Sequence, residues 1–161
     1  MGTAVSTEDQ KWLGEAIRLA TENVEAGGGP FGAVVVRDGS VIATGTNQVT
    51  PTLDPTAHAE VVAIRAACRE VGDFQLTGCV LVSSCEPCPL CISAALWARV
   101  DKVLYAADRD DAAVAGFDDR AFYDLFTTPR ESWPVPVARL STVDHRAPFD
   151  AWLSKPDRLA Y

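Results

Sequence analysis

The chain has 161 residues, enough for one domain that buries a core without disulfide bridges. Its formal net charge is −8 and it has no block of Lys or Arg, which argues against nucleic acid or an anionic membrane surface as a partner. No run reaches the roughly 18 apolar residues of a membrane span, and residues 1–8 lack the basic and apolar regions of a signal peptide. We therefore expect a cytoplasmic protein that acts on a small molecule.

Hydrophobic periodicity predicts alternating helices and strands up to about residue 107. Thr7 and Gln10 resemble a capping box at the start of the first helix, which the glycines at 27–29 end. Asp38-Gly39 is a two-residue hairpin signal between the first two strands. In chain order we expect a helix of about 18 residues from Thr7, strands over 31–36 and 41–46, a loop over 48–55, a helix over 56–71, a strand over 79–83, a helix over 89–98 and a strand over 100–107. The last three elements imply a parallel crossover.

Beyond Asp108 the pattern is weaker, because the acidic stretch has little periodicity and three prolines interrupt residues 127–136. In this part we expect a loop, a short helix over 120–126, a second loop, a fifth strand around 137–140 and a last helix over 148–153. No repeat or linker marks a second domain. The sequence therefore predicts an α/β fold, a three-layer α/β/α sandwich around a mixed five-stranded sheet, in a single domain over residues 1–161.

Two short motifs supply the residues for a zinc ion. Cys88 and Cys91 lie three apart at the start of a predicted helix, and His58, at the start of another, completes a three-ligand set. Helix N-termini favour thiolate over thiol. A fourth position is left for water, whose pKa falls from about 16 to about 7 on zinc. Glu60 is the candidate base that takes the water proton and passes it to a ring nitrogen and a departing amine.

The cysteines also allow other interpretations. Cys68 and Cys79 sit among apolar residues and are interpreted as small core residues. If Cys85 supplied a third sulfur, the site would be structural and the protein a zinc-stabilised binding module without turnover. An iron-sulfur run would need another cysteine three residues after Cys91, where Ala94 stands. We favour the catalytic zinc and interpret Cys85 as a structural residue of the turn.

The order His58-x-Glu60 followed by Pro87-Cys88-x-x-Cys91 resembles the signature of the cytidine deaminase-like superfamily. The chain is more similar to its bacterial guanine deaminase branch than to the cytidine or tRNA adenosine branches, because of the Ala-Gly-Phe-Asp-Asp segment at 115–119 and the terminal tyrosine. The similarity runs over nearly the whole chain and includes residues 29–34, 54–60, 83–91 and 105–107. The resemblance implies a cytidine deaminase-like fold, one Zn²⁺ per chain and hydrolytic deamination of guanine to xanthine and ammonia.

The same resemblance assigns substrate contacts. It implies that Asn47 hydrogen-bonds the purine and that Phe31 and Trp97 line its faces, with ordinary core packing as the alternative for the two aromatic residues. Asp119 would accept from the N1 and N2 edge of guanine, because an acidic group suits those donors. Asp118 is the neighbour that could take its place.

In the guanine deaminases the C-terminal segment covers the site of a partner. The resemblance therefore implies a homodimer in which the segment at about 140–161 is exchanged and Tyr161 caps the neighbouring pocket. The roles of Asp144 and His145 stay open. So does the substrate, since guanosine and other purine, pyrimidine or triazine deaminases resemble this branch.

Overall fold

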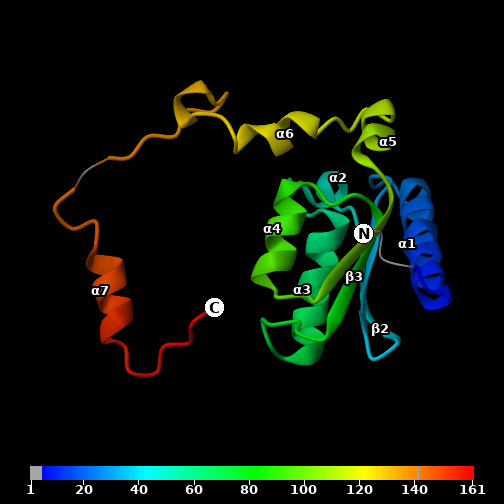
Figure 1. The fold of residues 1–161 in the computed structure, drawn as a ribbon, viewed down its shortest axis with the longest axis horizontal. Helices are drawn as coiled ribbons and strands as arrows, with labels where there is room; N and C mark the ends of the chain where they lie inside the picture. Colours follow the sequence, from blue (N-terminus) through cyan, green and yellow to red (C-terminus); the bar gives the residue numbers. More distant parts are fainter. Residues whose placement is uncertain (1–4, 141) are drawn as a thin grey trace. The chain divides into compact units, whose positions relative to one another are not determined.

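A computed structural model describes residues 5–140 and 142–161 of the chain (Figure 1). Contacts divide the chain into two compact units, Met1–Tyr123 and Asp124–Tyr161, and each unit is described by itself. Among the described residues, no helix combines the length and the apolar character needed to cross a membrane.

The first unit is built on a mixed four-stranded sheet in the order β2-β1-β3-β4. The strands are β1 (Gly32–Arg37), β2 (Ser40–Thr46), β3 (Cys79–Cys85) and β4 (Lys102–Ala107). β1 pairs antiparallel with β2 and β3, and β3 pairs parallel with β4, which confirms the predicted mixed sheet and parallel connection. The β1–β2 hairpin turns at Asp38 and Gly39, whose φ angles of 50° and 74° are those of the Asp-Gly turn that the sequence indicates.

Alternate residues of β1 face two different cores, which places helices on both faces of the sheet (Figure 1). Ala33 and Val35 belong to the core that contains alanines of α3 (Ala59–Val71) and α4 (Pro89–Trp97). Val34 and Val36 pack with Trp12 of α1 (Thr7–Glu25). The fold is thus α/β, with helices above and below the sheet as predicted.

The helix ends follow capping chemistry that the sequence located to within a few residues. α1 is capped by Ser6, not Thr7: the Ser6 hydroxyl accepts from the Asp9 N–H and the Asp9 carboxylate accepts from the Ser6 N–H, both at 3.0 Å. His58 occupies the N-cap position of α3 without a side-chain capping bond, and Gly72, whose φ of 72° suits glycine, is the C-cap. α3 begins later than predicted because the Asp54 carboxylate accepts from the Thr56 N–H and holds a turn there.

Three predicted features are corrected. The expected loop over 48–55 contains a short helix, α2 (Val49–Thr52), and the expected loop after Asp108 contains α5 (Arg109–Val114). α5 forms because the Asp108 side chain accepts from two N–H groups of its first turn, each at 2.9 Å. Residues 137–140 form no strand, so the sheet of the described chain has four strands and the prediction of five is wrong. A strand needs a neighbour, and this segment has none within its own unit.

The second unit is mostly irregular. α6 (Arg120–Leu125) begins in the first unit and ends in the second. Within the second unit, η1 (Arg130–Ser132) is a single 3₁₀ turn and α7 (Ala147–Ser154) covers the predicted last helix. Phe126 and Trp133 meet edge to face with ring centroids 5.6 Å apart. His145 is engaged locally, with its Nδ1 2.9 Å from the Thr142 carbonyl oxygen.

Gly45 sets the spacing between β2 and α3, the helix that carries Glu60. A Cβ at this position would come within 2.5 Å of the Ala63 nitrogen and 3.0 Å of its Cα. We expect Gly45→Ala to lower the free energy of unfolding by about 1–3 kcal/mol, because the backbone of α3 must move. Urea denaturation measures the change. Gly14→Ala, on an exposed part of α1 with nothing within 4 Å, is the matched control and should be neutral or stabilising; equal effects of the two variants would contradict the packing argument.

Candidate metal centre and substrate pocket

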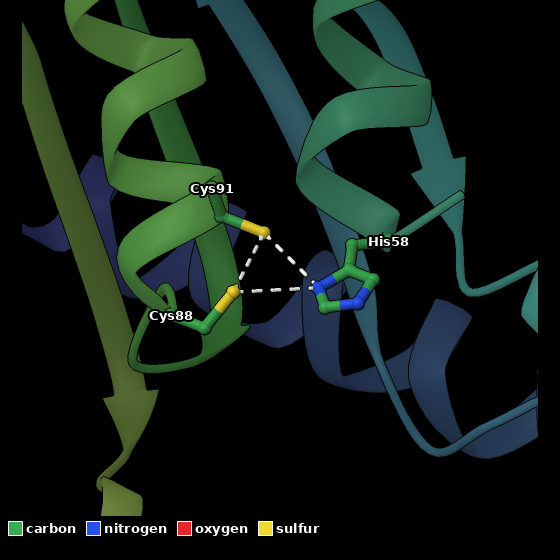
Figure 2. Close-up of side chains that lie close together, drawn as sticks. All are labelled: His58, Cys88 and Cys91. Atoms are coloured by element: carbon green, nitrogen blue, oxygen red, sulfur yellow. Dashed lines mark hydrogen bonds between the residues drawn. The ribbon is translucent and has the colours of Figure 1, made fainter. Parts of the chain in front are cut away.

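The two chemical motifs lie at the first residues of neighbouring helices (Figure 2). His58 is the N-cap of α3, and Cys88 is the N-cap of α4, with Pro89 as the first helical residue and Cys91 in the first turn. β3 ends at Cys85, and a short loop carries the chain from there to Cys88. Both motifs are therefore at helix N-termini, as predicted.

The side chains of His58, Cys88 and Cys91 point toward one another (Figure 2). The His58 Nδ1 lies 3.5 Å from the Cys88 sulfur and 3.3 Å from the Cys91 sulfur, and the two sulfurs are 3.5 Å apart. In a tetrahedral zinc site, with Zn–S of about 2.3 Å and Zn–N of about 2.0 Å, the ligand atoms stand roughly 3.5–3.8 Å apart. Within the described residues, no other group of three His, Cys, Asp or Glu side chains gathers in this way. The three residues fit zinc.

The environment of Cys88 favours the thiolate that binds metal. A hydrogen bond joins the Cys88 and Cys91 sulfurs and His58 adds a favourable charge, and together these interactions hold the pKa of the Cys88 thiol well below its ordinary value. At Cys85, in contrast, burial is the largest effect and raises the pKa to about 11. Cys85 is not a member of the metal-binding group, which agrees with its interpretation as a structural residue.

Glu60 lies in the first turn of α3, next to the metal-binding group. Its side chain is only 5% exposed. The Ser83 hydroxyl donates to its Oε1 at 2.9 Å and the Cys91 sulfur lies 3.3 Å from its Oε2. Burial raises the pKa of Glu60, so this carboxylate accepts a proton more readily than an exposed one. Glu60 is thus a buried carboxylate in contact with the metal-binding group without belonging to it.

A cavity of about 680 Å³ opens over this group, a volume in the range of small-molecule sites. Its lining includes His58, Glu60, Cys88 and Cys91 together with three predicted substrate contacts, Phe31, Asn47 and Asp119. The cavity therefore joins the metal-binding residues to groups that can hold a ring.

One wall of the cavity is aromatic and carries an amide. The rings of Phe31 and Phe117 meet edge to face, with centroids 5.0 Å apart. Asn47 lines the cavity and its Oδ1 accepts from the Val49 N–H at 3.2 Å, so the donor capacity of its side chain resides in the NH₂ group. Gly29 packs closely beside this amide, because a Cβ there would stand 3.0 Å from the Asn47 side chain and the amide would have to shift slightly.

Asp118 and Asp119 differ in their surroundings. Asp118 accepts two hydrogen bonds of 2.8 Å from the guanidinium of Arg120, and this pair is exposed. The Oδ1 of Asp119 is buried in the described chain and accepts no hydrogen bond there. Burial, followed by the nearby Cys88 charge, raises the pKa of Asp119. Asp119, and not Asp118, therefore offers the cavity an acceptor oxygen that has no protein donor.

Comparison with known proteins gives this arrangement a family. Residues 6–107 match the model of the cytidine and deoxycytidylate deaminase zinc-binding region. The chain belongs to the cytidine and deoxycytidylate deaminase family. The match contains all three zinc ligands and Glu60, so His58, Cys88 and Cys91 are the zinc-binding group of a zinc-dependent deaminase.

Several deaminases are similar to the chain. Guanine deaminase of Bacillus subtilis is 49% identical over 153 residues, covering 94% of this chain and 98% of the relative, and its crystal structure superposes with a TM-score of 0.91. A solved protein in complex with 8-azaguanine is 36% identical, with a TM-score of 0.67 over 71% of this chain and 66% of its own. The tRNA-specific adenosine deaminase of Aquifex aeolicus is 41% identical over 96 residues, 60% of this chain and 64% of the relative.

The residues that line the cavity differ in part from the predicted site residues. Trp97 lies at the far end of α4 from the zinc ligands and is not among the lining residues. Tyr161, Asp144 and His145 belong to the second unit, which is described by itself. Phe117, Glu86 and Arg109 do line the cavity. Phe117 belongs to the segment that carries the family resemblance, whereas nothing in the sequence marks Glu86 or Arg109 as paired across 23 positions.

Proposed function

We propose that this deaminase hydrolyses guanine to xanthine and ammonia. The observation that carries the proposal is the buried, unpartnered Oδ1 of Asp119 in the same cavity as Glu60 and the zinc-binding group. The N1–H and the exocyclic amine of guanine offer adjacent donors to such an acceptor, whereas adenine presents an acceptor at N1. The extent of the likeness to the guanine deaminase, which includes the Asp119 segment beyond residue 107, supports the same substrate.

The residues of the cavity divide the work of this reaction. Zinc, when bound, lowers the pKa of a water molecule from about 16 to about 7 and so supplies hydroxide at neutral pH. Glu60, buried with a raised pKa, carries two protons in turn: the first passes from the attacking water to a ring nitrogen, and the second passes from the hydroxyl added to the ring carbon to the departing amine. The Ser83 hydroxyl holds one oxygen of this carboxylate, so the other is directed toward the zinc ligands. One water is consumed for each ammonia released.

The remaining contacts orient the purine. Asn47 donates its amide NH₂ to a ring acceptor, and Phe31, supported by Phe117, packs on the ring. Tyr161 completes the enclosure in this proposal, supplied by a second protomer.

The proposal includes a homodimer that exchanges its C-terminal segments. Asp124–Tyr161 is shorter than the roughly 40 residues needed for an independent core, so it requires a surface to cover. In the first unit, β4 pairs only with β3 among the described residues, and an open sheet edge invites pairing with another chain. Leu96, on α4, is 72% exposed and offers apolar surface. A segment exchanged between two copies would cover such surfaces.

Mixed dimers test the exchange directly. Glu60→Ala and Tyr161→Ala chains, each inactive alone, are mixed after denaturation and refolded together with zinc. If Tyr161 caps the partner's pocket, one site in each mixed dimer is complete and about a quarter of wild-type activity returns. Continued inactivity of the mixture, or a monomer by light scattering, would contradict the exchange of C-terminal segments. Full activity of Tyr161→Ala alone would contradict the role of Tyr161.

A substrate panel tests the reaction itself. Guanine, guanosine, adenine, cytosine and cytidine are scored for ammonia release with the zinc-loaded protein. We expect guanine to give the highest kcat/KM. Guanosine is the alternative within the enzyme class, and preference for it would place a ribose in the cavity. No ammonia from any base would instead favour a zinc-stabilised binding module.

Asp119→Asn should discriminate between the two neighbouring aspartates. An amide presents a donor as well as an acceptor and carries no charge, so we expect kcat/KM for guanine to fall by about 10- to 100-fold. Asp118→Asn is the matched control, because its exposed pair with Arg120 contributes little. A larger loss in the Asp118 variant than in the Asp119 variant would transfer the role to Asp118.

A further inference from the structure

Three side chains outside the catalytic set form a closed chain of contacts beside the metal centre. Arg109, the first residue of α5, donates from Nε to the Glu86 Oε2 at 3.0 Å and from Nη2 to its Oε1, and its backbone N–H donates to Oε2 at 3.1 Å. The guanidinium carbon stands 3.5 Å from the centroid of the Tyr123 ring. The Tyr123 hydroxyl donates to the Pro87 carbonyl oxygen at 2.8 Å. Glu86, Arg109 and Tyr123 are referred to below as the clamp.

The clamp connects two parts of the site that are separate in sequence. Glu86 and Pro87 immediately precede the zinc ligand Cys88. Arg109 and Tyr123 lie on either side of the segment that carries Phe117 and Asp119. Among the described residues, the side-chain hydrogen bonds that join segment 109–123 to residues 86–88 are those of the clamp.

The two ends of the clamp are not equally supported. Residues 86–88 are held between β3 and α4, both of which belong to the packed core. Segment 109–123 lies after the last strand, and its short helices α5 and α6 bury no residue. Loosening the clamp therefore moves the Asp119 side of the cavity more than it moves Cys88.

The chemistry of the clamp requires arginine. A guanidinium makes two parallel hydrogen bonds to one carboxylate while its flat face stacks on an aromatic ring, and an ammonium group cannot do both. The Glu86 side chain is only 14% exposed, so its carboxylate is largely shielded from water, while the Arg109 side chain is 36% exposed. The bidentate contact therefore fixes the orientation of the Arg109 guanidinium relative to the Glu86 carboxylate as well as the distance between them.

We propose that Glu86, Arg109 and Tyr123 are positioning residues that hold Asp119 and Phe117 at a fixed distance from the zinc-binding group and thereby set affinity for the base. The clamp acts on substrate binding and not on metal retention. The inference rests on the proposed function for the identity of the substrate.

Arg109→Lys tests the clamp, because it keeps the charge and removes the bidentate, stacked geometry. Arg18→Lys is the matched control: Arg18 makes the same two-point contact with Glu15, at 2.9 and 2.6 Å, on the exposed face of α1. We expect Arg109→Lys to raise KM by about tenfold or more and to weaken binding of 8-azaguanine, measured by calorimetry, by a similar factor. Zinc content should stay at one per chain and kcat should change by less than about threefold.

Tyr123→Phe is the conservative second variant, since it keeps the ring over the guanidinium and removes only the bond to Pro87. We expect the same direction with a smaller rise in KM. The inference would be overturned if the KM and the 8-azaguanine affinity of Arg109→Lys were within twofold of those of the Arg18→Lys control. It would also be overturned if Arg109→Lys lost zinc in proportion to its loss of activity. If the wild-type enzyme deaminates another base, the proposed function fails separately and the KM for that base decides on the clamp.

Discussion

Glu60→Gln is expected to retain zinc and to lose turnover. The amide keeps the size of the side chain and can still accept from the Ser83 hydroxyl, but it cannot take up a proton from water. General acid–base catalysis by a positioned side chain contributes about 10²–10⁴-fold, so kcat for ammonia release should fall by at least that factor. Glu60 is not one of the three zinc ligands, and zinc measured by mass spectrometry should remain at one per chain.

Glu70→Gln is the control for this experiment. Glu70 lies on the same helix, α3, but is exposed at its other end and touches neither the cavity nor the zinc-binding group. It should therefore leave kcat and zinc unchanged. Ammonia release by Glu60→Gln above one tenth of the wild-type rate would exclude Glu60 as the proton carrier. Loss of zinc with loss of rate would make it a metal-supporting residue instead.

The core of the fold is predictable because its signals are local. The apolar, β-branched run of β1, the Asp-Gly turn at 38–39 and the glycine at 72 are each visible in a few neighbouring residues. α5 was missed because its acidic residues were interpreted as loop composition, although Asp108 and Asp111 form a capping box. The prediction of a strand at 137–140 was wrong for a different reason. Its apolar residues have no neighbouring strand in their own unit, and the sequence of a single segment does not reveal whether it has a partner strand.

The site divides in the same way. His58, Glu60, Cys88 and Cys91 were predictable because each pair falls within one turn of a helix N-terminus, where spacing alone fixes geometry. The pairing of Glu86 with Arg109 was not, since it depends on how the end of β4 meets the loop after β3. Resemblance left the choice between Asp118 and Asp119 open, and the capture of Asp118 by Arg120 supplies the physical difference between them.

Cys91→Ala is expected to abolish zinc binding and to destabilise the fold. Cys91 is 1% exposed, and its sulfur lies against both the His58 Nδ1 and the Glu60 carboxylate. Its removal leaves only two protein ligands, whereas a catalytic zinc site has three. We expect zinc below about one tenth per chain and a fall in kcat of at least about 10³-fold. The melting temperature should drop as well, because metal bound only by the folded state adds its binding free energy to stability.

Cys85→Ala and a chelator complete this test. Cys85 is also buried, and its sulfur lies 3.7 Å from the Asp108 carbonyl oxygen. Its removal should lower the melting temperature through packing but leave zinc at one per chain and the enzyme active. A chelator should lower the melting temperature of the wild-type and Cys85→Ala proteins and leave that of Cys91→Ala unchanged, because the latter has no zinc to lose. Loss of zinc from the Cys85 variant would instead indicate that Cys85 is a fourth zinc ligand. A fourth protein ligand would occupy the position that water needs, and the protein would then be a structural zinc module.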